Sequence, residues 1–241
     1  RDVRVEHDLL GEREIPAHAY WGVHTLRAVE NFPITGRWIG LWPELVRALA
    51  LVKHAAAQTN YELGLLDETK AKLIIAACRE IADGALHDEF VVDMIQGGAG
   101  TSTNMNANEV IANRALELAG RKKGDYAFLH PIEHVNMAQS TNDVYPTALR
   151  LALRFAIVDL IAAMEELKVA FTAKSVEFRD LLKVGRTQLQ DAVPMTLGQE
   201  FSTFAVMLGE DQQRLAEAGA LIEEINLGAT AIGTGINSHP G

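Results

Sequence analysis

Four segments of this sequence are dense in Gly, Thr, Ser and Asn, the residue types that can hold a small anion with backbone N–H groups, hydroxyls and amides. They cover residues 96–106, 139–143, 185–192 and 228–235. The first directly precedes a segment of helical pattern, so free N–H groups at a helix N-terminus would face a ligand there. Three segments offer hydroxyl and amide donors, and only Arg186 adds a fixed positive charge. This balance favours a small carboxylate over a phosphate ester, which Arg and Lys usually bind.

Each segment also has a purely structural interpretation. Segment 96–106 could be a flexible turn with a helix N-cap, since it lacks the Gly-Lys-Ser/Thr ending of a P-loop and follows no parallel-sheet pattern. In the second segment, Ser140, Thr141 and Asn142 are more polar side chains than one cap requires, although capping remains an alternative. The amide of Asn142 could receive an ammonium proton or hold a carboxylate. The other two segments are ordinary loops when each is taken alone.

The composition is that of a globular protein. Of 241 residues, 48% are apolar and 22% are charged, which excludes disorder as the main state. The formal net charge of -10 disfavours nucleic acid and anionic membrane surfaces as partners. No run is long and apolar enough for a transmembrane helix, and no signal peptide is visible. The single Cys78 lies in an apolar run, so we expect a buried thiol in a reducing, cytoplasmic compartment.

The histidines form no pattern typical of a metal site, and we expect neither a metal nor a cofactor. His130 and His134 have helical spacing, but Pro131 between them argues against a regular helix. The remaining histidines are scattered, and we expect them to be surface or structural residues: His7, His18, His24, His54, His87 and His239.

The elements that must position these segments are mostly helices. Apolar residues at helical spacing predict helices over about 43–64, 67–84 and 104–118. Pro43 suits the first turn of the first helix, and Asp67 would cap the second. Strand patterns are limited to short pieces near the N-terminus, such as 3–5. The three helices predict a compact N-terminal unit.

Two longer runs, about 146–182 and 196–226, predict very long helices joined by the loop at 185–192. At about 1.5 Å per residue, the first would span roughly 50 Å. Two such helices cannot bury their apolar faces within one small globule, so we expect an elongated antiparallel pair that packs with helices of other chains.

We therefore expect an all-α fold with two parts. An N-terminal, mainly helical domain would cover residues 1–140, and residues 141–241 would form the first part of a long-helix bundle, truncated before the rest of the bundle and a C-terminal domain. The chain begins at Arg1 without Met and ends in loop-like sequence at 237–241. We expect a piece of a longer protein.

At the four segments the sequence closely resembles the aspartase/fumarase superfamily, and the resemblance covers essentially the whole chain. The motifs that carry it are DLLG at 8–11, YWGVHTLRA at 20–28, GGAGTS at 97–102, STND at 140–143, GRTQLQD at 185–191 and AIGTG at 231–235. They resemble the ammonia-lyase branch more than class II fumarases, which tend to have GAQTQR, GSGT, SSND and a Thr-His pair. The sequence PIEH at 131–134 also departs from the Asn-Asp that fumarases carry in a secondary dicarboxylate site.

This resemblance implies reversible anti elimination of ammonia from L-aspartate to give fumarate. A proton beside the β-carboxylate would be removed, giving an aci-carboxylate dianion before the amine leaves, so hydrogen-bond donors must surround that carboxylate. By the same resemblance, Thr101, Ser140 and Thr141 would hold the β-carboxylate, with Thr101 and Asn142 also near the amino group.

The resemblance also implies roles for the segment at 185–192. Thr187 would bind the α-carboxylate, and Gln188 takes the place of a histidine that helps with the amine in many relatives. The family's signature loop, Gly-Ser-Ser-x-Met-Pro-x-Lys-x-Asn-Pro, does not occur in the sequence, and we expect it beyond Gly241. Its serine is the general base, so the resemblance gives this chain substrate-binding residues and no catalytic base.

The family's members are homotetramers whose long helices form a central bundle and whose active sites each use three subunits.

Two alternatives to an ammonia-lyase remain: a class II fumarase, which adds water to fumarate, and a catalytically silent scaffold of the same fold. The presence of all the threonine, serine and asparagine donors together argues against the scaffold.

Overall fold

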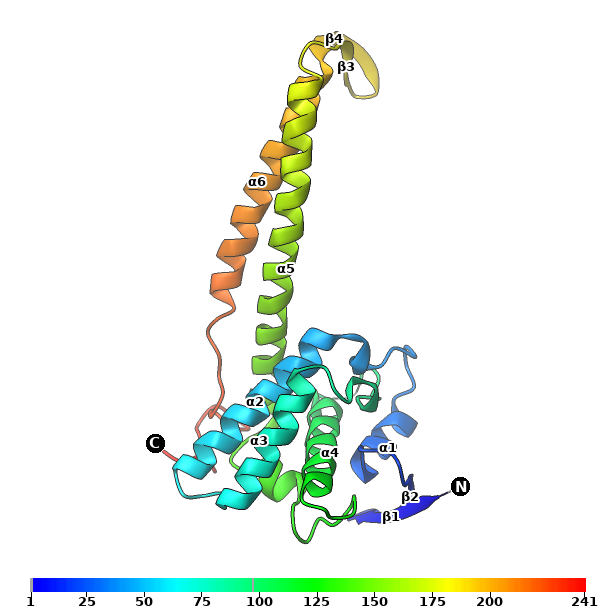
Figure 1. The fold of residues 1–241 in the computed structure, drawn as a ribbon, viewed down its shortest axis with the longest axis vertical. Coiled ribbons are helices and arrows are strands. Elements are labelled where there is room, and N and C mark those ends of the chain that lie inside the picture. The colour runs from blue at the N-terminus through cyan, green and yellow to red at the C-terminus, as the bar shows by residue number, and fades with distance from the viewer. Residues whose placement is uncertain (1, 97) are drawn as a thin grey trace. The chain divides into compact units, whose positions relative to one another are not determined.

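The computed structural model describes residues 2–96 and 98–241 and is mostly helical (Figure 1). The chain divides into two compact units. The first consists of Arg1–Ala152 together with Ile225–Gly241, and the second is Leu153–Glu224.

The first unit begins with a hairpin and a short helix. Strands β1 (Val3–Asp8) and β2 (Gly11–Pro16) pair antiparallel, and helix α1 spans Val23–Asn31. Ile15 of β2, Val23 of α1 and Ala19 between these elements form a small buried core. The sequence predicted only short strand pieces here and no helix at α1.

Three longer helices make the body of the first unit. They are α2 (Pro43–Glu62), α3 (Glu68–Ala82) and α4 (Thr101–Leu118). As predicted, Pro43 lies in the first turn of α2, and the Asp67 carboxylate accepts the N–H of Lys70 to cap α3. The start of α4 lies three residues earlier than the predicted Asn104, at Thr101. The Cys78 thiol is buried in α3, and burial raises its pKa to about 12.

Several short turns connect these helices. Ile39–Leu41 and His87–Glu89 form 3-10 turns, and Pro131–Val135 forms a single π-type turn rather than a regular helix. The ring of His130 accepts N–H groups of this turn, so His130 has a capping role.

Helix α5 spans Thr141–Glu177, so it starts before the predicted Pro146 and ends before the predicted 182. Pro146 lies inside the helix and has no N–H to donate to the carbonyl oxygen of Asn142. That oxygen instead accepts the side-chain amide of Asn226 at 3.2 Å. A long-range hydrogen bond thus satisfies the carbonyl group that the proline leaves unpaired.

The second unit contains the rest of α5, a hairpin, and helix α6 (Leu197–Leu221). Strands β3 (Leu182–Thr187) and β4 (Gln190–Thr196) pair antiparallel, so the predicted loop at 185–192 is wrong. Gln188 and Leu189 form its two-residue turn with φ of 52° and 64°, the left-handed geometry that joins tightly twisted strands. These two residues lack the Asn-Gly or Asp-Gly that usually signals such a turn, and so the hairpin was not predicted.

Helices α5 and α6 run antiparallel, as predicted (Figure 1). The Gln212 side-chain amide donates to the Ile161 carbonyl oxygen, and near the other end the ring of Phe171 packs against Phe201 and Phe204. A full capping box of Thr196 and Gln199 starts α6, which ends at Leu221 rather than at the predicted 226.

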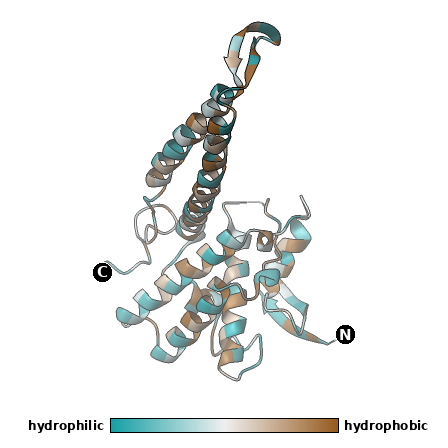
Figure 2. Cartoon of the chain, turned by 45° about the horizontal axis from the view of Figure 1, so that its top comes forward, coloured by the Kyte–Doolittle hydropathy of each residue, from teal (hydrophilic) through white to brown (hydrophobic). Residues whose placement is uncertain are grey.

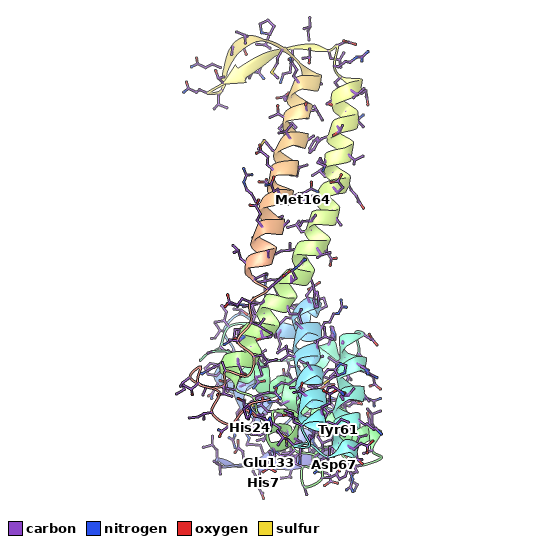
Figure 3. The ribbon with its side chains drawn as sticks, turned by 90° about the vertical axis from the view of Figure 1, so that its left-hand side faces the viewer. His7, His24, Tyr61, Asp67, Glu133 and Met164 are labelled. Atoms are coloured by element: carbon purple, nitrogen blue, oxygen red, sulfur yellow. The ribbon has the colours of Figure 1, made fainter. Side chains whose placement is uncertain are left out.

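Large apolar side chains remain exposed along both helices, and Figure 2 colours the hydrophobic residues of these helices brown. Val158, Leu160, Val169, Val206 and Met207 are each about half exposed. Met164, labelled in Figure 3, lies midway along α5. Among the described residues, no helix is both long and apolar enough to cross a membrane. An exposed apolar stripe of this extent is typical of a protein–protein interface.

We therefore expect the purified chain to self-associate. A stripe of this length on a monomer would be an aggregation hazard, and helices of further copies would cover it. Light scattering coupled to size-exclusion chromatography at micromolar concentration should give a mass well above 26.3 kDa. A stable, well-behaved monomer would contradict the expectation.

Candidate active site

Two of the four polar segments meet at the N-terminal end of α5. The buried carboxylate of Asp143 accepts the N–H of Ser140 at 3.1 Å and, from the segment at 228–235, the N–H of Thr230 at 2.8 Å. The side-chain amide of Asn142 donates to the carbonyl oxygen of Ala231 at 2.7 Å. These bonds join segments that lie more than eighty residues apart in the sequence.

The amide of Asn142 is oriented by this bond. Because its Nδ2 atom donates to Ala231, its Oδ1 atom is the acceptor left for a ligand. Of the two possibilities that the sequence left open, this orientation supports reception of an ammonium proton. Ser140 Oγ accepts the N–H of Asn142 at 3.2 Å, so the hydroxyl of Ser140 has its proton available to donate.

The segment at 96–106 joins the same place through α4. The side-chain amide of Asn104 donates to Thr141 Oγ1 at 3.0 Å, which ties the first turn of α4 to the first residue of α5. Gly100 precedes α4 with φ of +88°, and a Cβ there would lie 2.3 Å from the ring of Tyr145. Only glycine allows this close approach. Gly97 of the predicted motif lies outside the described residues.

Two surface hollows border this segment. Asn142 and Gly98–Gly100 line a hollow of about 630 Å³ together with Tyr145. Thr101 lines a second hollow of about 460 Å³ that also includes His24 and Arg27 of α1. Thr101, Ser140, Thr141 and Asn142 thus lie around one region of the first unit, which the sequence alone did not establish.

The sequence analysis did not single out His24 and Arg27, which line the second hollow. They lie three positions apart, so they share one face of α1, and His24 is labelled in Figure 3. The Arg27 guanidinium pairs with both carboxylate oxygens of Asp8 at 2.7 and 2.8 Å, and this pairing lowers the pKa of Asp8. The His-x-x-Arg spacing within segment 20–28 was the available signal.

A buried glutamate fixes α1 in this position. Glu109 of α4 is 1% exposed and accepts three backbone N–H groups, from Gly22, His24 and Thr25, at 2.8 to 3.0 Å. Burial raises the pKa of Glu109, while His24 and the N–H donors oppose that shift. The carboxylate caps the N-terminus of α1 from another helix, where negative charge is favoured.

We expect Glu109→Gln to destabilise the first unit. The amide keeps the volume of the carboxylate but puts an NH₂ group against backbone N–H donors, which should cost about 1–3 kcal/mol of unfolding free energy. Urea unfolding measures the loss. Glu62→Gln is the control, since Glu62 is exposed and accepts only from Gln58 on its own helix. Equal stability of the two variants would contradict the capping role.

The remaining predicted residues, Thr187 and Gln188, lie in the second unit. Both are exposed at the tip of the β3–β4 hairpin, where Thr187 pairs with Gln190 across the turn. The guanidinium of Arg186, the positive charge noted in this segment, pairs with Asp191 at 3.2 Å on the surface.

Among the described residues, no group of three His, Cys, Asp or Glu side chains could hold a metal ion.

Comparison with known proteins identifies the family. The model of a family described as Lyase matches residues 11–241. The chain belongs to this lyase family, part of the aspartase/fumarase superfamily. The chain is 61% identical to the aspartate ammonia-lyase of Pseudomonas aeruginosa over 239 residues, covering 99% of the chain and 50% of that protein. It is 54% identical to the aspartate ammonia-lyase of Escherichia coli, covering 98% and 50%.

Solved structures agree with this assignment. A structure described as fumarate lyase:delta crystallin from Brucella melitensis bound to cobalt matches with a TM-score of 0.96 and 59% identity, over 99% of this chain and 52% of that one. A class II fumarase from Schistosoma mansoni matches with a TM-score of 0.91 and 36% identity, over 100% and 50%. The chain therefore spans about half the length of the lyase-family relatives that it matches.

Proposed function

We propose that the full-length protein is an aspartate ammonia-lyase, which converts L-aspartate to fumarate and ammonia. The observation that carries the proposal is the identity of 54–61% with proteins of that name, against 36% with a structure described as a class II fumarase. The orientation of Asn142 supports it, because an amide oxygen left free to accept suits the amine of aspartate better than the carboxylates of fumarate.

The proposed substrate-binding groups are the hydroxyls and the amide gathered around the start of α5. Thr101, Ser140 and Thr141 hold the β-carboxylate, where negative charge increases as the neighbouring proton is removed. Asn142 accepts from the ammonium group. We place the general base in the half of the lyase-family relatives that this chain does not cover.

The α-carboxylate is bound by Thr187, with Gln188 beside it, and we infer that this hairpin comes from a different subunit. The family resemblance supports this, because one active site in the family uses three subunits. The full-length protein is then a cytoplasmic homotetramer with sites shared between subunits. In it, residues 1–140 form an N-terminal domain and residues 141–241 begin the central bundle domain.

The assay follows fumarate by its ultraviolet absorbance. Full-length protein should consume fumarate with ammonium and form it from aspartate, but leave fumarate in ammonium-free buffer unchanged. Consumption of fumarate without ammonium would instead indicate a class II fumarase, and inactivity in both a silent scaffold.

A further inference from the structure

A buried lysine lies directly behind the Ser140–Asn142 segment. Lys53 of α2 is 0% exposed, and its Nζ atom donates to Asn136 Oδ1 at 2.7 Å and to Gln139 Oε1 at 2.9 Å. Burial lowers the pKa of Lys53 to about 7, against the attraction of Cys78 and Asp143. Both the ammonium and the neutral amine have enough N–H groups for these two bonds.

The bonds of Asn136 fix which way its amide faces. Its Oδ1 atom accepts from Lys53 and also from the side-chain amides of Asn104 at 3.1 Å and Asn108 at 3.2 Å. Its Nδ2 atom donates to the carbonyl oxygen of Gln139. A reversed amide would place its NH₂ group against three donors, so only one orientation satisfies the cluster.

The orientation of Asn136 in turn fixes that of Asn104. Since Asn136 presents an oxygen, Asn104 must present its NH₂ group, and its second N–H donates to Thr141 Oγ1 at 3.0 Å. The hydroxyl oxygen of Thr141 is then an acceptor toward the core, and its proton is directed away from Asn104. A hydroxyl held in this way keeps its proton free to donate to the ligand.

We propose that Lys53 is a positioning residue, which acts through Asn136 and Asn104 to make the Thr141 hydroxyl a hydrogen-bond donor to a dicarboxylate substrate. This inference rests on the proposed function only for the identity of the substrate. In this arrangement Lys53, buried in α2, controls the direction of the Thr141 hydroxyl without contacting it.

The backbone turn between Asn136 and Ser140 is strained. Ala138 has φ of 58°, a left-handed conformation that is unfavourable for alanine. The turn is held by Gln139, which Lys53 binds, and by Asn60 of α2, whose amide donates to the carbonyl oxygen of Met137 at 3.0 Å. Asn60 and the amide of Gln139 hold this turn without Lys53, so replacing Lys53 should misdirect the Thr141 hydroxyl without releasing the backbone before Ser140.

A double-mutant cycle in the full-length protein tests the proposal. Lys53→Met, which keeps the volume and removes the donors, should lower kcat/KM for aspartate about tenfold, as expected for one misdirected hydrogen bond. In the Thr141→Val background the same change should lower it less than twofold, because there is no hydroxyl left to orient. Additive losses in the two backgrounds would overturn the proposal, since a purely structural lysine acts independently of Thr141.

Controls separate positioning from stability. Cys78→Ala perturbs the buried surroundings of Lys53 without breaking the network and should lower the unfolding temperature while kcat/KM stays within twofold. Lys72→Met makes the same chemical change on the exposed face of α3 and should alter neither. If Lys53→Met does not fold, the cycle uses Asn104→Leu, which removes the last link. Failure of both variants to fold would overturn the proposal, because a structural role would then suffice.

A parallel measurement keeps this test independent of the reaction. The dissociation constant of succinate, a dicarboxylate without the amine, is measured by calorimetry for all four proteins of the cycle. Coupling between Lys53 and Thr141 should appear there as well. Wild-type protein that deaminates no aspartate would refute the proposed function, whereas the succinate cycle would still decide the role of Lys53.

Discussion

The 241 residues, produced on their own, are expected to deaminate no measurable aspartate even if they fold and self-associate. The proposed substrate-binding donors lie in the chain, but the proposed base lies outside it. Proton abstraction by a positioned base contributes about 10²–10⁴-fold. Groups that act as a unit are not partly replaced by the ones that remain. Release of ammonia and formation of fumarate, at saturating aspartate, measure the result.

Complementation provides the control. Mixing this chain with a separately expressed piece that begins near position 242 should restore activity, and the same mixture with Thr141→Val in this chain should be much less active. Turnover by this chain alone would show that the base lies on one of the segments described above.

The helices could be predicted from the sequence because their apolar faces are regular. Helices α2 and α3 begin at or next to the predicted caps, and α5 and α6 form the predicted antiparallel pair. The β3–β4 hairpin was missed because its turn relies on left-handed Gln188 and Leu189, which carry no usual turn signal. Helix α1 was missed because its cap is Glu109, a residue of another helix more than eighty positions away.

The carboxylate-binding character of the candidate site stays a prediction from the sequence, and the way its segments come together could not be predicted. The Gly-, Ser- and Thr-rich segments already indicated a carboxylate held by neutral donors. That Asn226 and Thr230 fold back on the start of α5 depends on tertiary contacts, which no local pattern encodes. Lys53 gave a weak signal, since it lies four residues after Leu49 on the buried face of α2.

Thr187→Val in the full-length protein is expected to lower kcat/KM for aspartate roughly ten- to a hundredfold. Valine has nearly the volume of threonine but no hydroxyl, so one hydrogen bond to a charged carboxylate is lost, worth about 1.5–3 kcal/mol. The substitution is a clean test because Thr187 is exposed at the end of β3 and its backbone pairing with Gln190 does not depend on the side chain. Valine also favours a strand, so the hairpin should persist.

Steady-state kinetics on both variants of a matched pair decide the role of Thr187. Thr203→Val is the partner, because Thr203 is also exposed but donates its hydroxyl to Gln199 of its own helix; its kcat/KM should stay within twofold of wild type. The Thr187 variant should keep the wild-type unfolding temperature, which places its loss in substrate binding and catalysis rather than in folding. If its kcat/KM equals that of Thr203→Val, Thr187 does not bind the α-carboxylate, and the β3–β4 hairpin then has no hydroxyl at the substrate.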